Sequence, residues 1–303
     1  MRNVLMIGAT GTNGRPVAHE LVAAGFSVTA LVREPEKARL GLPAAVRLLP
    51  GDLRDPTSLD HALADQHVVY LNLSVAQTER AHDFHPESEG LANLLAAVRR
   101  RAPTQLLRIV YLSSLVHQYQ GLNGFDWWAF RVKQQALALL RDSGVAHTVF
   151  YPSTFMETLL AQVQGKKLIL AGNSLFPMHF IAGHDYGRMV AEALRHSMNH
   201  ADNQHYIVQG PEALTLDGAA RQFIANNPVA GLQPQQLPLK LLRMLGWFSA
   251  RFNYLAHILE AINRYPEAFA GEAAWRDLHK PTTTVAAFAR QVGQSAEGLH
   301  IKR

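Results

Sequence analysis

The chain has 303 residues with 48% apolar and 17% charged side chains, a composition typical of a globular protein built from one elaborated domain or two. Its formal charge of +5 favours an anionic partner. The basic side chains are scattered along the chain, and their one cluster, Arg99-Arg100-Arg101, lies at the end of a predicted helix. We therefore expect a phosphorylated cofactor and not nucleic acid. The absence of cysteine excludes disulfides, thiolate catalysis and cysteine-ligated zinc, and no uncharged apolar run reaches the roughly 18 residues of a membrane span.

A glycine-rich turn between a strand and a helix stands at the start of the chain. Residues 4–7 (VLMI) form an apolar run typical of a buried parallel strand, and a helix-period pattern begins at Val17. Gly8, Gly11 and Gly14 lie between them. Such a turn places free backbone N–H groups at the positive end of a helix dipole, where a phosphate binds. We predict that Gly8 permits the tight turn, Gly11 the close approach of pyrophosphate, and Gly14 the packing of helix on strand. A purely structural turn is the alternative.

Strands and helices then alternate through the first 150 residues. The further predicted strands are Ser27–Val32, Val46–Leu49, His67–Leu73, Leu106–Leu112 and Val145–Tyr151. Helices are predicted from Pro56, with Asp55 as the cap, from Pro86 to Arg101, and from Asp126 to Asp142. This alternation predicts an α/β fold with a doubly wound parallel sheet, the dinucleotide-binding (Rossmann) fold.

The second half is less regular. Short strands are predicted at Lys167–Ala171, His179–Ala182 and Tyr206–Val208, and helices at Asp185–His196, Leu214–Ala225, Pro238–Ile262 and Thr284–Val292. We expect residues 1–155 to form the nucleotide-binding domain, with its sheet extended by parts of 165–210. Residues 156–303 then form a smaller, mostly helical substrate or lid region interleaved with it.

The residues after the second and third strands bear on the choice of nucleotide. NAD-binding units usually carry an acidic residue at the end of the second strand, whereas an arginine there accommodates the 2′-phosphate of NADP. Arg33 takes this place and Glu34 follows it, so the sequence favours NADP(H), with NAD(H) as the alternative. A solvated loop residue is the structural alternative for Arg33. Asp52 follows the third strand, where it either reaches the adenine or only stabilises a turn.

Ordered motifs over residues 1–225 resemble the NmrA-like branch of the atypical short-chain dehydrogenase/reductases. The motifs are GATGTNGRPV, LVREPEKA, GDLRDPTSL, YLSS, FRVKQQ, LRDSGVAHTVFYPSTFME and DYGRMVAEAL. Members of this branch bind NADP(H) or NAD(H) in a Rossmann domain with a variable C-terminal region over the substrate cleft. The resemblance implies a cofactor site made of Gly8, Thr10, Gly11, Thr12, Asn13, Gly14, Arg33, Asp52, Leu53, Asn72, Ser74, Ser113, Lys133, Tyr151 and Pro152.

The chain departs from this family at the catalytic tyrosine. Short-chain dehydrogenases use Tyr-x-x-x-Lys, in which the tyrosine carries the proton and the lysine holds the nicotinamide ribose. Lys133 fits the lysine, but Ala129 stands four residues before it. Lys133 lies on or beside the predicted buried face of its helix, so either a cofactor ribose is its partner or its ammonium reaches solvent. Ser113 is expected to orient the substrate, and Lys133, His117 and Tyr119 are the candidates for moving the proton.

Aromatic side chains mark the expected substrate side. Trp127 and Trp128 start the helix that carries the lysine, and core packing is their structural alternative. Phe155 and Met156 belong to a segment that matches the substrate-side motif of the family, although Thr158 stands where asparagine is usual. These four aromatic and apolar residues are the predicted substrate contacts.

The segment 237–262 is rich in apolar residues, with Lys240, Arg243 and Arg251 among them. Three interpretations stay open: a lid over the cleft, a face for a protein partner, or an amphipathic helix on a membrane surface. The tail that contains it is similar to nucleoside-diphosphate-sugar epimerases and to accessory-subunit relatives in respiratory complex I.

The sequence therefore predicts an NADPH-dependent oxidoreductase that transfers hydride to a small quinone-like or carbonyl acceptor, since some quinone reductions need little protein acid. The alternatives are a non-catalytic NADP(H) redox sensor that acts through a protein partner, and an accessory subunit of a membrane-associated complex. No metal is expected, because the pairs His82/His85 and His196/His200 bring no third ligand. No signal peptide and a cytoplasmic location are expected, because residues 1–3 lead directly into the first strand.

Overall fold

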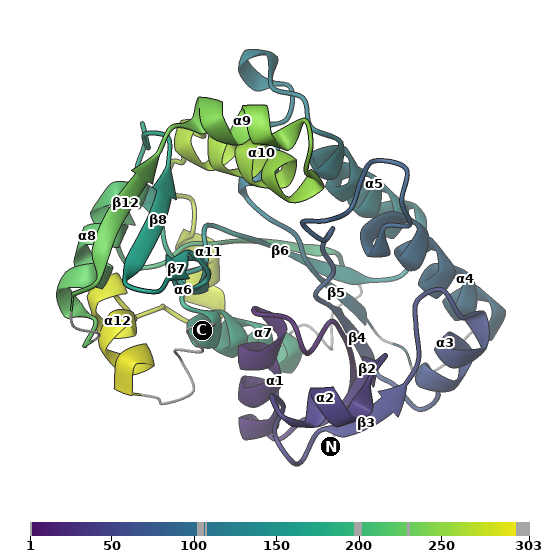
Figure 1. Ribbon diagram of the computed structural model, residues 1–303. Helices are drawn as coiled ribbons and strands as arrows, with labels where there is room; N and C mark the ends of the chain where they lie inside the picture. The colour runs from purple at the N-terminus through teal and green to yellow at the C-terminus, as the bar shows by residue number, and fades with distance from the viewer. Residues whose placement is uncertain (1, 102–105, 107, 197–201, 229–230, 295–303) are drawn as a thin grey trace.

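A seven-stranded parallel sheet forms the centre of the protein, as the computed structural model shows for residues 2–101, 106, 108–196, 202–228 and 231–294 (Figure 1). The strand order is β10-β6-β5-β4-β1-β2-β3. The bounds are β1 (Asn3–Ile7), β2 (Ser27–Val32), β3 (Arg47–Pro50), β4 (Val68–Leu71), β5 (Arg108–Leu112), β6 (His147–Pro152) and β10 (Gln204–Val208). The predicted doubly wound sheet is confirmed, and β10 extends it beyond the six strands of the first half.

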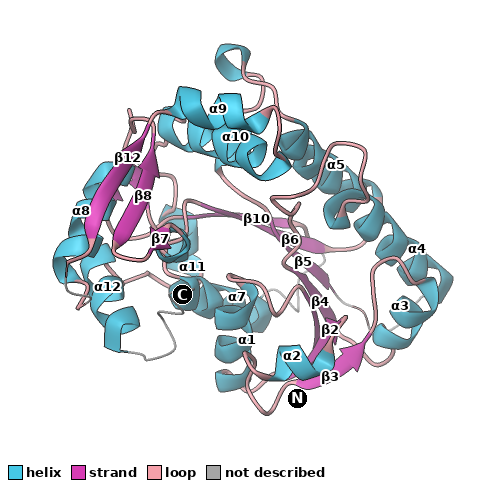
Figure 2. Ribbon diagram, viewed as in Figure 1, coloured by secondary structure: helices cyan, strands magenta, loops and turns pink. Residues whose placement is uncertain are grey.

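Helices cover both faces of this sheet (Figure 2). On one face lie α1 (Gly14–Ala23), α2 (Pro35–Arg39), α7 (Gly183–His196) and α11 (Glu272–Asp277); on the other lie α3 (Pro56–Ala62), α4 (Leu91–Arg101) and α5 (Trp128–Asp142). Side chains alternate between the faces of a strand, so Val4 and Met6 of β1 pack toward α1 and α7, while Leu5 and Ile7 pack toward the other helices. The apolar run of the first strand is therefore buried on both sides.

Local signals in the sequence set several of these elements. Asp55 caps α3, because its carboxylate accepts the backbone N–H of Thr57 at 2.9 Å, and Pro56 occupies the first helical position. The predicted cap is confirmed. A π-helical turn, Pro86–Gly90, precedes α4, and two short 3₁₀ turns, Val116–Tyr119 and Leu122–Gly124, lead from β5 toward α5.

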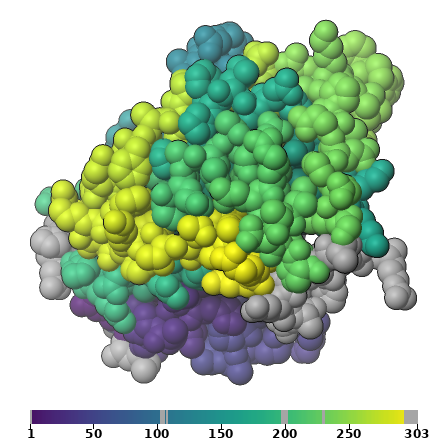
Figure 3. Space-filling model, turned by 90° about the vertical axis from the view of Figure 1, so that its left-hand side faces the viewer, coloured from purple at the N-terminus to yellow at the C-terminus, as the bar shows by residue number. Residues whose placement is uncertain are grey.

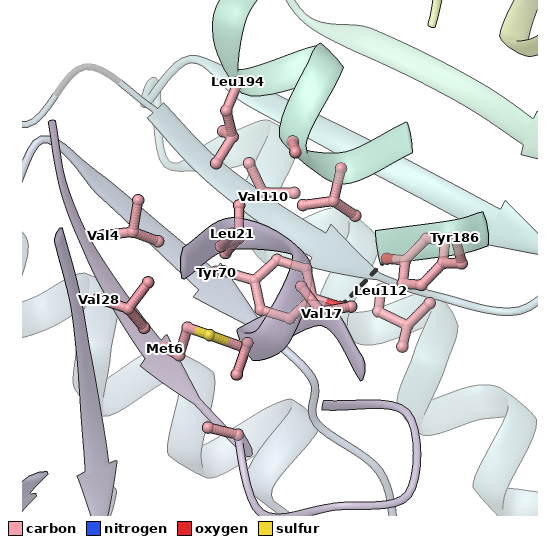
Figure 4. Close-up of a cluster of buried hydrophobic side chains, with 14 of the residues drawn as sticks. Val4, Met6, Val17, Leu21, Val28, Tyr70, Val110, Leu112, Tyr186 and Leu194 are labelled. Atoms are coloured by element: carbon pink, nitrogen blue, oxygen red, sulfur yellow. Dashed lines mark hydrogen bonds between the residues drawn. The ribbon is translucent and has the colours of Figure 1, made fainter. Parts of the chain in front are cut away.

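Figure 4 shows the core between the sheet and α1. Val17 and Leu21 of α1 face Tyr70 of β4, and the hydroxyl of Tyr70 donates to that of Tyr186 on α7 at 3.2 Å. Both tyrosine side chains are fully buried, so their hydroxyl groups satisfy each other inside an apolar core. The helix α7, which comes from the second half of the chain, thus completes the core of the first sheet.

The other elements of the second half pack around a core of their own. A three-stranded sheet of order β12-β8-β7 is covered by helices, and a two-stranded ribbon pairs β9 with β11. Its elements are α6 (Glu157–Ala161), β7 (Val163–Gln164), β8 (Lys167–Ala171), β9 (Met178–His179), β11 (Ala213–Leu214), α8 (Leu216–Asn226), β12 (Gln233–Leu237), α9 (Leu239–Gly246), α10 (Ala250–Arg264) and α12 (Val285–Gln294). Most of the face seen in Figure 3 belongs to residues beyond 200, in green and yellow.

Of the short strands expected in this half, Tyr206–Val208 joins the main sheet as part of β10, whereas the strand at 167–171 pairs with β7 and β12. One expectation for this half is wrong. The single helix expected at 238–262 is broken into α9 and α10, because the backbone of Ser249 is extended. The absence of a side chain at Gly246 lets the start of α10 pack closely against the end of α9. A Cβ atom on Gly246 would lie 3.0 Å from the Cα of Asn253. Within the described part of the chain, no helix combines the length and the apolarity needed to cross a bilayer.

Candidate functional site

A cleft of about 1180 Å³ lies at the carboxyl edge of the main sheet. The residues that follow β1, β4, β5 and β6 form one side of it, and residues of α10 and β8 form the other. The carboxyl edge of a doubly wound sheet, where the strand order reverses, is where such folds bind ligands. Of the residues predicted for the cofactor, those that line the cleft are Gly8, Thr10, Gly11, Thr12, Asn13, Asn72, Ser74, Ser113, Lys133 and Pro152.

The glycine turn is closed by Asn72, at the end of the neighbouring strand. Gly8 has φ +84°, and a Cβ atom there would lie 2.1 Å from the carbonyl oxygen of Asn72. A Cβ atom on Gly14 would lie 2.2 Å from the carbonyl oxygen of Gly8. That same oxygen accepts the side-chain amide of Asn72 at 2.9 Å and the backbone N–H of Gly11 at 3.2 Å. The turn therefore requires glycine at two positions, and it presents residues 10–13 to the cleft at the start of α1, a geometry that fits a dinucleotide pyrophosphate.

Lys133 lines the cleft and forms a buried ion pair. Its Nζ lies 2.6 Å from Oε1 of Glu87, and the hydroxyl of Tyr111 donates to the same oxygen at 2.7 Å. The Glu87 side chain is fully buried and that of Lys133 is 14% exposed. Burial and the adjacent Glu87 carboxylate raise the pKa of Tyr111 well above its usual value. Lys133 thus reaches the cleft from the buried side of α5, with a carboxylate that fixes its ammonium group.

Ser113 and Ala129 lie on the same side of the cleft as Lys133. Ser113 follows β5 and is almost fully buried, and Ala129 lies one helical turn before Lys133 on α5. The position at which the family carries tyrosine therefore faces the cleft, and its methyl group offers no proton. Ser113 and Lys133 are the two predicted catalytic residues that the structure brings to this cleft.

His117 and Tyr119 lie outside the cleft lining of the described residues. His117 packs against the ring of Tyr151 with centroids 5.9 Å apart, and its Nδ1 contacts the carbonyl of Ser114. Burial lowers the pKa of His117, so its imidazole is neutral at neutral pH. Tyr119 is buried against Phe125, with ring centroids 5.0 Å apart. Both side chains are core residues in this structure.

Other predicted cofactor residues also lie outside the described cleft lining: Gly14, Arg33, Asp52, Leu53 and Tyr151. Arg33 is exposed just after β2, whose neighbour in the sheet is β1. Asp52 accepts the backbone N–H of Arg54 at 2.9 Å, which is the turn contact that the sequence left open. Leu53 is buried in the core beneath α3 and α4, and the hydroxyl of Tyr151 contacts Nδ1 of His205 at 3.2 Å.

The predicted substrate residues divide between the cleft and the core. Trp127 and Phe155 line the cleft, whereas Met156 is fully buried in the core of the second half. Trp128 stacks on His85, with ring centroids 4.8 Å apart, outside the described lining. The opposite wall comes from α9 and α10 through Leu242, Arg251, Phe252, Tyr254, Leu255, Ile258, Leu259 and Ile262. The broken helix therefore serves as a wall of the cleft.

Two carboxylates of the cleft were not predicted. Glu157 accepts the backbone N–H of Gly183 at 2.8 Å, and burial raises its pKa from 4.5 to about 7. Glu267 is held by the hydroxyl of Ser153 at 2.7 Å, the backbone N–H of His179 at 3.0 Å and the side-chain amide of Gln209 at 2.8 Å. Glu157 is the last residue of the substrate-side motif, so the sequence did contain a signal for it. Glu267 lies in a loop between α10 and α11, where no pattern marks it.

The histidine pairs have ordinary surroundings. Among the described residues, no three histidine, cysteine, aspartate or glutamate side chains come together in a way that could hold a metal ion. Nδ1 of His85 contacts Glu79 at 3.0 Å, and His82 is exposed. His200 lies outside the described residues.

Residues 8–197 match the NAD(P)H-binding family. The chain belongs to this family. Its predicted resemblance to the NmrA-like atypical short-chain dehydrogenase/reductases is thereby confirmed, and the predicted nicotinamide dinucleotide cofactor follows from family membership. The site residues above stay predictions, since family membership does not assign them.

Three known proteins illustrate what the chain is similar to. It is 30% identical to a (4-alkanoyl-5-oxo-2,5-dihydrofuran-3-yl)methyl phosphate reductase of Streptomyces griseus, over 70% of this chain and 69% of that protein. It is 28% identical to the photosystem II assembly factor Ycf39 of Cyanophora paradoxa over 53% of this chain, and spans 48% of the length of that relative. The fold matches an NADPH-dependent quinone oxidoreductase of Escherichia coli complexed with NADPH, with a TM-score of 0.71 at 20% identity over 95% of this chain and 99% of that one.

Proposed function

We propose that this chain is an NADPH-dependent oxidoreductase that reduces a small quinone-like or carbonyl acceptor. One observation carries the proposal: the glycine turn, Lys133 and an apolar wall face the same cleft of about 1180 Å³, which has room for a dinucleotide and a small second ligand. The names of the reductase and the quinone oxidoreductase to which the chain is similar support the same class of reaction.

The residues of the cleft fit the parts of the cofactor. Thr10, Gly11, Thr12 and Asn13, at the start of α1, would bind the pyrophosphate. Lys133 would donate hydrogen bonds to the nicotinamide ribose. Exposed Arg33, after β2, would pair with the 2′-phosphate, which is the basis for NADP(H) over NAD(H). When bound, the cofactor supplies the hydride, and the protein has to orient it and shield the reaction from water.

The part of the cleft around Ala129 favours an acceptor that needs no proton from the side chain at position 129. Ala129 leaves position 129 without the phenol that the short-chain dehydrogenases carry there, and the imidazole of His117 lies outside the described lining. Lys133 remains as a cation beside the reacting groups, where it would stabilise negative charge that develops on an acceptor oxygen. Trp127 and Phe155 would pack on a planar ring. A quinone-like acceptor satisfies these conditions better than a simple ketone.

Titration with NADPH and with NADH, followed by an acceptor screen on the same sample, tests the proposal. We expect NADPH to bind more tightly and quinones to be reduced faster than ketones. Lys133→Ala should weaken NADPH binding, whereas Arg131→Ala, an exposed position on the same helix, should leave it unchanged. If neither nucleotide binds, the glycine turn is only structural and the proposal fails.

A second candidate is a regulatory or accessory role, through a protein partner or at a membrane. The exposed apolar side chains of α9 favour it, as does the absence of the tyrosine at position 129. Capture of a partner whose binding differs between NADP+ and NADPH, with no turnover on any acceptor, would establish the sensor in place of the enzyme.

A further inference from the structure

Four large apolar side chains project from α9 and from the turn that follows it. Trp247 is 82% exposed and Phe248 is 85% exposed, and Met244 and Leu241 are exposed one and two turns earlier. We call these four residues the α9 tip. In Figure 3 the light-green segment that contains α9 protrudes at the upper right of the molecule. Exposed apolar side chains that gather in this way mark a surface that contacts something other than water.

The packing of α9 and α10 does not account for the α9 tip. The inner sides of these helices are occupied, because Leu242 and Leu259 are buried in the core of the second half and face the cleft. Trp247 and Phe248 lie in the turn where the helix breaks, between Gly246 and the extended Ser249. A turn that served only to reverse the chain would function equally well with polar residues.

The charged side chains within the segment that carries the α9 tip are all positive. Lys240, Arg243 and Arg251 lie within residues 238–259, a segment that contains no aspartate or glutamate. Lys240 and Arg251 are exposed. Arg243 pairs with Glu260 at 2.5 Å. Glu79 lines the same hollow as Trp247 and contacts Nδ1 of His85 at 3.0 Å. The exposed charges that α9 and the start of α10 themselves carry are positive.

We propose that the α9 tip docks on the surface of an anionic lipid bilayer. Tryptophan and phenylalanine insert at the level of the lipid headgroups, and basic side chains beside them are attracted to anionic lipids. A protruding turn with two adjacent aromatic rings can insert between lipid headgroups, because a fluid bilayer adapts its surface to the shape of the inserted side chains. A protein partner is the alternative that the experiment below separates.

Docking there would bring the bilayer against the outer side of α9, the helix whose inner side lines the cleft through Leu242. The docking proposal does not depend on the proposed function.

Vesicle binding tests the proposal with three proteins: the unchanged chain, the double variant Trp247→Ser/Phe248→Ser, and Leu40→Ser. Leu40 is the matched control, since it is 90% exposed directly after α2, away from α9. We expect sedimentation with phosphatidylcholine–phosphatidylglycerol vesicles at low salt, weaker binding to phosphatidylcholine alone, and quenching of tryptophan fluorescence by brominated lipid. The double variant should lose about tenfold in vesicle affinity, and Leu40→Ser should bind as the unchanged chain does.

Two results would overturn the proposal. One is no binding to the anionic vesicles at low salt. The other is binding that the double variant retains, which would assign it to another surface. NADPH titration of the double variant checks that it is folded, and it also separates the two proposals, because docking can fail while NADPH binding and turnover persist.

Discussion

Glu157 offers a direct test of the electrostatics inside the cleft. Its carboxylate is largely buried, accepts one backbone N–H from Gly183 at 2.8 Å, and lies near the buried Asp185, so burial and like charge raise its pKa to about 7. An unfolded chain exposes the same side chain to water, where its pKa is 4.5. Glu157→Gln removes the titration and nearly keeps the shape.

The raised pKa has a defined effect on stability. Between pH 4.5 and about pH 7 the folded state keeps the proton that the unfolded state has released. The contribution of Glu157 to stability is therefore fully present below pH 4.5 and is lost as the pH rises through about 7. At about 1.4 kcal/mol per pKa unit, the loss is about 3 kcal/mol.

Urea unfolding between pH 4.5 and pH 8, followed by circular dichroism, measures this effect. We expect the free energy of unfolding of Glu157→Gln to exceed that of the unchanged chain progressively as the pH rises, with the gap approaching about 3 kcal/mol at pH 8 relative to pH 4.5. Glu36→Gln, at an exposed position of α2, should follow the unchanged chain at every pH. Parallel curves for Glu157→Gln and the unchanged chain would refute the assigned pKa.

Three further predictions concern stability and the cofactor. Lys133→Met should lower the free energy of unfolding in urea by about 3 kcal/mol, because it leaves the fully buried Glu87 without its cation. The double variant Lys133→Met/Glu87→Leu should recover most of the lost stability. Equal losses in the single and the double variant would contradict the ion-pair argument. Gly14→Ala should abolish NADPH binding in titration or unfold the chain, because the alanine Cβ would lie 2.2 Å from the carbonyl oxygen of Gly8. Unchanged NADPH binding and an unchanged Tm would show that the turn can accommodate a side chain at this position. Asp55→Ala should lower the free energy of unfolding by about 1 kcal/mol by removing the cap of α3, and no change would mean that water replaces the cap.

The parts of the fold that were predictable are those with local signals. The apolar strand at 4–7, the glycines at 8 and 14 and the cap at Asp55 each act on residues close in sequence, so a pattern alone identifies them. The same holds for Lys133, because its place on the buried side of α5 follows from helical spacing. The glycine spacing therefore leads to the end of the sheet at which the cleft lies.

The remainder depends on contacts between distant segments. Lys133 meets Glu87 across 46 positions, and nothing near either residue indicates the pair. The strand β12, with the sequence QPQQL, has no apolar alternation and exists because β8 offers it a free edge. The break after Gly246 is equally invisible, since the apolar residues on both sides of it continue as in one helix.

The cleft joins several packing clusters of the protein. The glycine turn rests on the main sheet, whereas Phe252 of α10 packs on the core that contains Phe223 and Phe288. Ile258 of α10 packs on that core and also on the cluster that contains Trp127 and Phe130, on the side of α5, the helix that carries Lys133. A substitution at Phe252 therefore disturbs a core that does not hold the glycine turn, whereas a substitution at Ile258 also disturbs the surroundings of α5.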